Sequence, residues 1–414
     1  MLRRAGAHPG RVDCVGLGAV ATDPTAPSVP APARSRSLRR AAAALLAVAV
    51  VTGCARFDTP YNEAFTPVPE AEPFEPGPGP GGPGGPDAPA PPGPGEDDDE
   101  QDPVPRQGDC PDPDPAVVAA CLDSTGPLVM LPDGVSALVG ERTTGQIMRV
   151  SIDAAPHPQL HVPVDAAGDG GLTGLALSPT YEEDGLVYAY ITTAEDNRVV
   201  RLAAGDVPKP VLTGLPRGEH GNAGALLFDD QGALTVLTGD GGDPAAAADP
   251  DSRAGKVLRL PGGPDDEPQI LTGGMGAGGG LCLAEDRSLW ITDRTAAADR
   301  LQRLPDGADQ ATVVWSWPQR PGIGGCAVGD DTVVVGGGAE NAAILLPIGE
   351  SGAVLGDPLP LSQDEYGRIG AVAFGAEHAL WAGTVNRTGG DPAETDDRVV
   401  ILQLEAVTGP ESLI

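Results

Sequence analysis

The chain has 414 residues, enough for two or three ordinary domains or for one large repeat domain. Its 59 glycines and 45 prolines, with only 3% aromatic residues, favour a turn-rich all-β protein with a disordered segment and argue against a helical bundle. The net charge of -33 gives solubility and disfavours nucleic acid and anionic lipid surfaces as partners.

The first element in chain order is a signal peptide at residues 34–54, RSRSLRRAAAALLAVAVVTGC. Basic residues precede an apolar run from Ala41 to Val51, and small residues follow it. The run is shorter than the roughly 20 apolar residues that a membrane-spanning helix needs. Because the ending Val-Thr-Gly-Cys looks like a bacterial lipobox, we predict that Cys54 is lipidated and becomes the mature N-terminus. An ordinary buried cysteine is the alternative.

Residues 1–53 are therefore assigned to a leader and lipoprotein signal peptide, and we expect the mature protein to be exported and lipid-anchored to the outer face of the bacterial cell membrane. Residues 1–33 precede the signal without a recognisable role, which suggests a misassigned translation start. Residues 54–109 are rich in proline, glycine and acidic residues and cannot bury enough apolar surface to fold. They are predicted to form a disordered tether.

Four cysteines remain beyond the tether: Cys110, Cys121, Cys282 and Cys326. An exported protein lies in an oxidising compartment, so two disulfides are expected. We predict the pairs Cys110–Cys121 and Cys282–Cys326, while four cysteines allow two other pairings. No spacing typical of a Cys/His metal site occurs.

Residues 110–414 contain six weak repeats, each with a turn signal before a short apolar strand. The first apolar positions of these strands lie 44 to 55 residues apart, at Ala137, Val187, Leu234, Leu289, Val333 and Leu380. This period, with no helical pattern, is typical of propeller blades, whereas a two-sheet sandwich does not explain it. We predict an all-β fold in which residues 110–414 form a six-bladed β-propeller.

Several segments resemble one known family. Asp169–Pro179 reads DGGLTGLALSP, Glu219-His220 follows, and Gly239–Arg259 and Gly367–Ile369 come later in the same order. These segments are similar to those of the glucose/sorbosone dehydrogenase family, secreted six-bladed β-propellers that use pyrroloquinoline quinone (PQQ). The resemblance implies a sugar dehydrogenase that passes electrons to an external acceptor, with PQQ and Ca²⁺ as cofactors and a sugar as ligand.

The resemblance also implies roles for individual residues. His220 occupies the place of the general base, which takes the sugar hydroxyl proton while a hydride moves to the quinone, and Glu219 would orient it. Arg368 would bind the cofactor and Asp169 would touch the sugar. An exposed loop histidine is the alternative for His220.

Other cofactor positions of the family are filled differently. Its arginine and asparagine that hold the acid groups of PQQ fall on Gly276 and Ala277, and its second arginine in the last blade falls on Gly370. Arg368 is then the single arginine expected at a cofactor with three carboxylates, which normally needs several charged donors. A non-catalytic cell-envelope binding propeller is therefore an alternative function.

One acidic glycine-rich loop, GDGGD, contains Asp240 and Asp243. Their carboxylates are candidate Ca²⁺ ligands, because this ion prefers oxygen atoms. A solvated turn between strands is the alternative for this loop. A metal-dependent lactonase is a third function, but the sequence has no clear set of convergent acidic and asparagine ligands for it.

Overall fold

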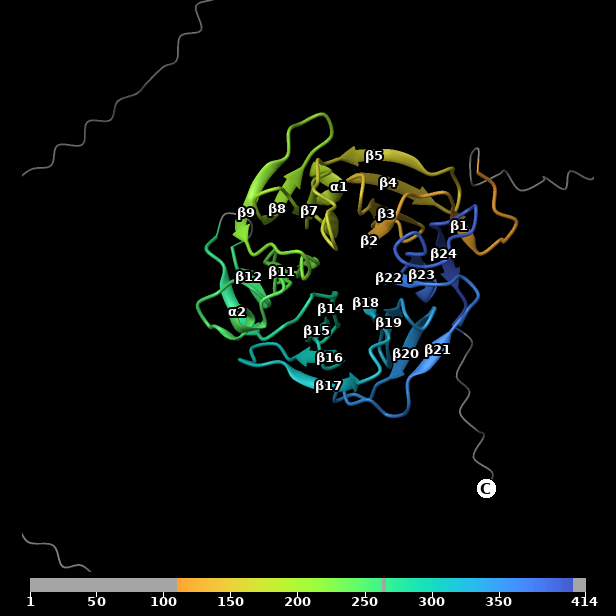
Figure 1. The fold of residues 1–414 in the computed structure, drawn as a ribbon. Helices are drawn as coiled ribbons and strands as arrows, with labels where there is room; N and C mark the ends of the chain where they lie inside the picture. The colour runs from red at the N-terminus through yellow and green to blue at the C-terminus, as the bar shows by residue number, and fades with distance from the viewer. Residues whose placement is uncertain (1–109, 263–265, 405–414) are drawn as a thin grey trace, which may run out of the picture. The chain divides into compact units, whose positions relative to one another are not determined.

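The computed structural model describes residues 110–262 and 266–404, which form six four-stranded antiparallel sheets around a central axis (Figure 1). The predicted all-β fold and the six-bladed propeller are confirmed. The predicted leader, the lipidated Cys54 and the tether at 54–109 lie outside the described residues. Within the described ranges, no helix has the length and apolar character needed to cross a membrane.

The strands follow the chain from blade to blade. Blades 1 and 2 contain β2 (Thr125–Met130), β3 (Ser136–Glu141), β4 (Gln146–Ser151), β5 (His157–His161), β6 (Leu172–Leu177), β7 (Val187–Thr192), β8 (Asn197–Leu202) and β9 (Lys209–Leu215). Blades 3 and 4 contain β10 (Gly224–Phe228), β11 (Leu234–Thr238), β12 (Lys256–Leu260), β13 (Gln269–Gly273), β14 (Leu281–Leu283), β15 (Leu289–Arg294), β16 (Asp299–Leu304) and β17 (Thr312–Trp317). Blade 5 contains β18 (Ile323–Val328), β19 (Thr332–Gly337), β20 (Ala342–Pro347) and β21 (Leu359–Leu361). Blade 6 contains β22 (Ile369–Phe374), β23 (Leu380–Thr384), β24 (Val399–Leu402) and β1 (Val117–Ala119).

Within residues 110–262 and 266–404, helical structure is confined to short turns between strands: α1 (Tyr181–Asp184), α2 (Pro244–Ala248) and the 3-10 turn η1 (Ala376–His378). The six repeat positions of the sequence all fall in the second strand of a blade, from β3 to β23. These second strands are buried on both faces, which explains their continuous runs of apolar and β-branched residues.

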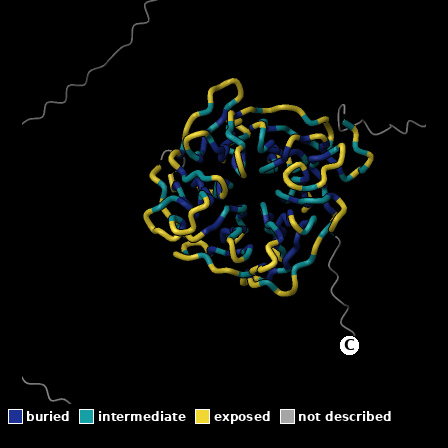
Figure 2. Tube along the Cα trace, viewed as in Figure 1, coloured by how far each residue is buried: buried dark blue, intermediate teal, exposed yellow. Residues whose placement is uncertain are grey.

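The core lies between neighbouring blades. Leu138 and Ile147 of blade 1 pack with Leu172 and Val187 of blade 2, and similar clusters recur around the ring. Figure 2 shows buried segments within the blades and exposed segments at the outer loops. A single blade cannot bury both of its faces, so the ring is stable only when it closes.

The ring closes through β1, which pairs with β24 as the outermost strand of blade 6. The last blade is therefore built from both ends of the described chain. The Cys110–Cys121 disulfide flanks β1, and the Cys282–Cys326 disulfide joins the inner strands of blades 4 and 5. Both predicted cysteine pairs are confirmed.

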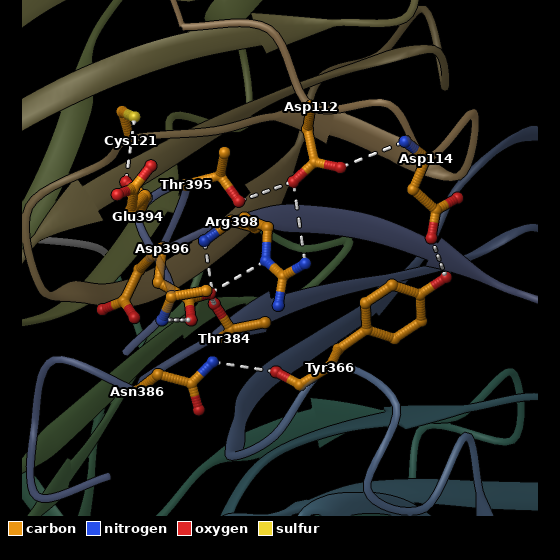
Figure 3. A network of polar contacts seen from close by, with 12 residues as sticks. Asp112, Asp114, Cys121, Tyr366, Thr384, Asn386, Glu394, Thr395, Asp396 and Arg398 are labelled. Carbon is orange, nitrogen blue, oxygen red and sulfur yellow. Dashed lines mark hydrogen bonds and ion pairs between the residues drawn. The ribbon is translucent and has the colours of Figure 1, made fainter. Parts of the chain in front are cut away.

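Polar contacts reinforce the closure (Figure 3). The Asp112 carboxylate accepts a hydrogen bond from the Thr395 hydroxyl at 2.7 Å and forms an ion pair with Arg398 at 3.7 Å. The Tyr366 hydroxyl donates to Asp114 at 3.0 Å. These contacts tie the residues before β1 to the last blade.

Beside this network lies Asp397, which is fully buried and accepts hydrogen bonds from the Thr125 and Arg387 backbone N–H groups. Burial raises the pKa of Asp397 to about 6, and the Asp396 carboxylate adds to this rise. A raised carboxyl pKa means that the folded protein binds the proton more tightly than the unfolded chain. The resulting stability is present at low pH and disappears as the pH rises through about 6.

We therefore expect the wild-type protein to gain about 1 kcal/mol of unfolding free energy relative to Asp397→Asn when the pH falls from about 7 to about 5. Thermal unfolding of both proteins at the two pH values measures this. A melting-temperature difference that does not change with pH would contradict it.

Candidate functional site

Strand alternation places the candidate residues at one end of the ring. In an antiparallel blade, the loops after the second and fourth strands lie at the same face. Arg142, Asp169, His220, Arg294 and Arg368 all lie in or beside such loops. We call this end of the propeller the site face.

The central pocket opens among these loops and has a volume of about 350 Å³. Glycine backbone in or beside the inner strands forms part of its walls, at Gly126, Gly174, Gly280, Gly325 and Gly370. A Cβ on Gly280 would lie 2.7 Å from the Gly325 Cα atom, so only glycine allows these strands to approach so closely. The pocket therefore combines closely spaced glycine backbone with apolar and charged side chains.

The charged lining of the pocket consists of three arginines and one aspartate: Arg142, Arg294, Arg368 and Asp169. They come from blades 1, 4 and 6 and from the loop before blade 2. The lining is therefore net positive in a chain of net charge -33. Such a site attracts an anion.

Arg368 lines the central pocket, and its role in binding the cofactor stays a prediction. Its backbone N–H donates to the Asn386 side-chain oxygen at 2.7 Å, which fixes the start of the inner strand β22. Its side chain passes Gly390 and approaches Gly338, where added Cβ atoms would lie 2.7 and 3.6 Å from it. The Arg368 Nε atom is buried without a hydrogen-bond partner in the described part of the chain. A ligand acceptor would satisfy it.

Arg142 and Arg294 line the same pocket as Arg368, although the sequence motifs single out Arg368 alone among the arginines. Arg142 Nη1 donates to the Gly170 carbonyl at 2.6 Å, and Arg294 Nε donates to the Gly278 carbonyl at 3.3 Å. Each guanidinium has five N–H donors, so most remain for a ligand. Burial lowers the pKa of Arg142, and the nearby Asp169 carboxylate opposes this shift.

Asp169 lines the pocket, but its carboxylate accepts hydrogen bonds from a neighbouring loop. It accepts hydrogen bonds from Gly221 N–H at 2.8 Å, Asn222 N–H at 3.2 Å and the Asn222 side-chain amide at 2.8 Å. Asp169 therefore positions the loop that contains His220. Its predicted contact with sugar stays a prediction.

His220 and Glu219 are exposed and do not belong to the pocket lining. Among the described residues, no hydrogen bond joins their side chains. Only the backbone beside His220 is fixed to the pocket wall, through Gly221 and Asp169. The structure does not bring the His220 ring into the central pocket, and its catalytic role stays a prediction.

At Gly276 and Ala277, where the resemblance places an arginine and an asparagine of the family, the backbone is closely packed. A Cβ on Gly276 would lie 2.2 Å from the Arg294 carbonyl oxygen. Gly276 N–H donates to Asp293 at 2.7 Å, and its carbonyl accepts from Asp240 N–H at 2.8 Å. Asp293 is fully buried and paired with Arg300. Burial raises the pKa of Asp293, although Arg300 acts against this rise.

The candidate calcium ligands have structural roles in the loop before β12. Asp243 is the N-cap of α2 and accepts from the Ala245 and Ala246 N–H groups, while Asp240 accepts from Gly242 N–H at 2.9 Å. Across residues 110–262 and 266–404, no group of three or more His, Cys, Asp or Glu side chains is placed to hold a metal. Calcium binding at Asp240 and Asp243 stays a prediction.

Comparisons with known proteins agree with this architecture. The sequence profile of the Glucose / Sorbosone dehydrogenase family matches residues 122–277. The PQQ-bound aldose sugar dehydrogenase from Streptomyces coelicolor is 30% identical, with a TM-score of 0.64 over 69% of this chain and 96% of that one. A putative oxidoreductase (glucose dehydrogenase) from Thermus thermophilus is 28% identical, with a TM-score of 0.62 over 69% of this chain and 98% of that one.

The soluble aldose sugar dehydrogenase from Escherichia coli, in its apo form, is 21% identical and shares the fold, with a TM-score of 0.58 over 69% of this chain and 97% of that one. No curated protein matches the sequence significantly. The extent of the match to the Streptomyces enzyme, together with the family profile and the six-bladed ring, shows that the chain belongs to the glucose/sorbosone dehydrogenase family.

Proposed function

We propose that the central pocket binds PQQ and that the protein oxidises a sugar, passing the electrons to an external acceptor. The observation that carries this proposal is the convergence of Arg142, Arg294 and Arg368 from three blades, with a buried Arg368 Nε atom that lacks a partner. Charged, forked donors of this kind suit a ligand with three carboxylates. The pocket volume falls in the usual range for cofactor sites.

The residues of the chain have distinct parts in this proposal. When bound, PQQ supplies the hydride acceptor. The three arginines would bind its carboxylates, and the glycine walls would let a flat ring system lie against backbone. His220, in the exposed loop held by Asp169, would take the proton of the sugar hydroxyl on a ring nitrogen, since a neutral imidazole is a suitable base near neutral pH. Asp169 would hold the His220 loop in place.

Titration of the purified mature protein with PQQ, followed by calorimetry, tests the proposal. We expect a dissociation constant in the micromolar range or tighter, and then aldose-dependent reduction of a dye acceptor. His220→Ala should lose dye reduction and keep PQQ binding. His157→Ala, at an exposed position on β5, is the matched control and should keep both.

Absence of PQQ binding at several hundred micromolar would overturn the proposal. The Gly276 and Ala277 departures would then favour the alternative, a binding propeller of the cell envelope without redox chemistry. Binding of PQQ without turnover of any aldose would retain the cofactor site and reject sugar oxidation.

We also propose that the protein is exported and lipid-anchored through Cys54. The signal sequence before Cys54 supports this, and the two disulfides fit an oxidising compartment. Cys54→Ala is expected to move the protein from the membrane fraction to the soluble fraction, without changing the melting temperature of the propeller. Cys14→Ala, in the leader, is the control. Retention of the Cys54→Ala protein in the membrane fraction would contradict the anchor.

A further inference from the structure

A second pocket, separate from the central one, lies between blades 4 and 5. It has a volume of about 260 Å³ and is formed between the outer strands β17 and β21, which lie in neighbouring blades (Figure 1). Loops of the site face also contribute to it, through Gln319, Glu340 and Gln363. Pro321 lines this pocket and the next residue, Gly322, lines the central pocket, so the two pockets are neighbours.

Tryptophan is concentrated at this second pocket. The chain has 4 tryptophans, and two of them, Trp315 and Trp317, line it. Their ring centroids are 6.4 Å apart, with an interplanar angle of 62°. Trp317 is buried and anchors the wall, whereas Trp315 is half-buried and presents part of its ring. The other two tryptophans, Trp290 and Trp381, are both 1% exposed and belong to the core.

Polar residues also line this second pocket. The side chains of Gln319, Glu340 and Gln363 line the pocket and make no hydrogen bond within the described residues. The two amides can both donate and accept, and the carboxylate accepts. Glu340 is the single charged side chain of the lining, so the pocket has no positive partner for an anionic ligand.

We propose that this pocket binds a neutral saccharide. A sugar ring has an apolar C–H face that fits against an indole, and hydroxyl groups that both donate and accept hydrogen bonds. Aromatic grooves also bind proline-rich peptides, but a proline-rich chain offers mainly carbonyl acceptors. A bound proline-rich peptide would leave the Glu340 carboxylate without a hydrogen-bond donor. A saccharide is therefore the favoured ligand, because its hydroxyl groups can donate to this carboxylate. This site is distinct from the central pocket and does not depend on the proposed oxidation.

Tryptophan fluorescence titration and calorimetry of the mature protein, without added PQQ, test the proposal. The probes are maltotetraose and cellotetraose, two neutral glucans of different linkage. We expect saturable binding of at least one of them, with a dissociation constant in the millimolar range or tighter. Trp315→Ala should weaken binding by about tenfold or more, because it removes the stacking surface. Trp315→Phe should restore part of the affinity.

Two variants serve as controls. Val313→Ala changes an exposed residue of the same strand outside the pocket lining and should bind like the wild type. Arg368→Gln changes the central pocket and should leave this binding unchanged. Gln363→Ala, on a surface loop that is not part of the core, should weaken binding without loss of folding, in case Trp315→Ala unfolds.

Four results would overturn the proposal. The first is the absence of binding of both glucans at tens of millimolar. The second is wild-type affinity in both Trp315→Ala and Gln363→Ala. The third is loss of binding in Arg368→Gln, which would assign the sugar to the central pocket. The fourth is binding of a proline decamer in preference to the glucans, which would assign the pocket to a proline-rich partner.

Discussion

Replacing Arg368 with glutamine is expected to lower the affinity for PQQ by about ten- to one-hundredfold, if the proposed function holds. The reason is that Arg368 has a buried Nε atom without a partner and its side chain lines the central pocket. A hydrogen bond between charged groups contributes about 1.5–3 kcal/mol. Calorimetric titration of both proteins with PQQ measures the change.

Replacing Arg142 or Arg294 with glutamine is also expected to lower the affinity for PQQ. The triple variant should bind no PQQ at micromolar concentration. Arg201→Gln is the matched control, since Arg201 lies on β8 outside the pocket lining. Equal PQQ affinity in wild type, Arg368→Gln and the triple variant would show that the arginines do not bind the cofactor.

The second large effect is expected from removing the closing strand. A fragment that begins at Ser124 lacks β1 and exposes the edge of β24. It also loses Val117, Val118 and Leu122, which are 1%, 1% and 2% exposed. Burial of each such side chain contributes about 1.5–3 kcal/mol, and together they approach the whole stability of a typical domain. We expect the fragment to be unfolded or to melt at least about 10 °C lower.

A fragment that begins at Gly108 retains β1 and the Cys110–Cys121 disulfide, and serves as the control. It should melt like the mature protein. Circular dichroism with thermal melting compares the two fragments. A fragment from Ser124 that melts at the control temperature would show that blade 6 is stable with three strands.

The fold could be predicted because a propeller repeats one physical pattern. Ala137, Val187 and Leu234 lie at or next to the start of the second strands of successive blades, and these strands are buried on both faces. Their apolar runs are therefore visible without knowledge of distant contacts. The Cys110–Cys121 pair is close in sequence, and the Cys282–Cys326 pair lies at similar positions in adjacent blades, on β14 and β18.

The pocket was harder to predict, because its charges come from different blades. Arg142 and Arg294 each lie five residues after a repeat position, at Ala137 and Leu289. Five residues after the repeat positions Val333 and Leu380 come Gly338 and Val385, which also line the pocket. The repeat pattern thus contains a signal for the pocket lining, whereas the family motifs point only to Arg368 and Asp169 among its charged residues. Side-chain direction, as for His220, depends on loop contacts that no periodicity encodes.

The placement of Cys110 and Cys121 on either side of β1 has a mechanical consequence. Any tension that reaches Cys110 along the preceding chain passes through the disulfide to Cys121. The covalent path bypasses residues 111–120, so the pulling force does not act along the hydrogen bonds between β1 and β24. A load on the N-terminal side is therefore carried by a covalent bond and not by the hydrogen bonds that pair β1 with β24.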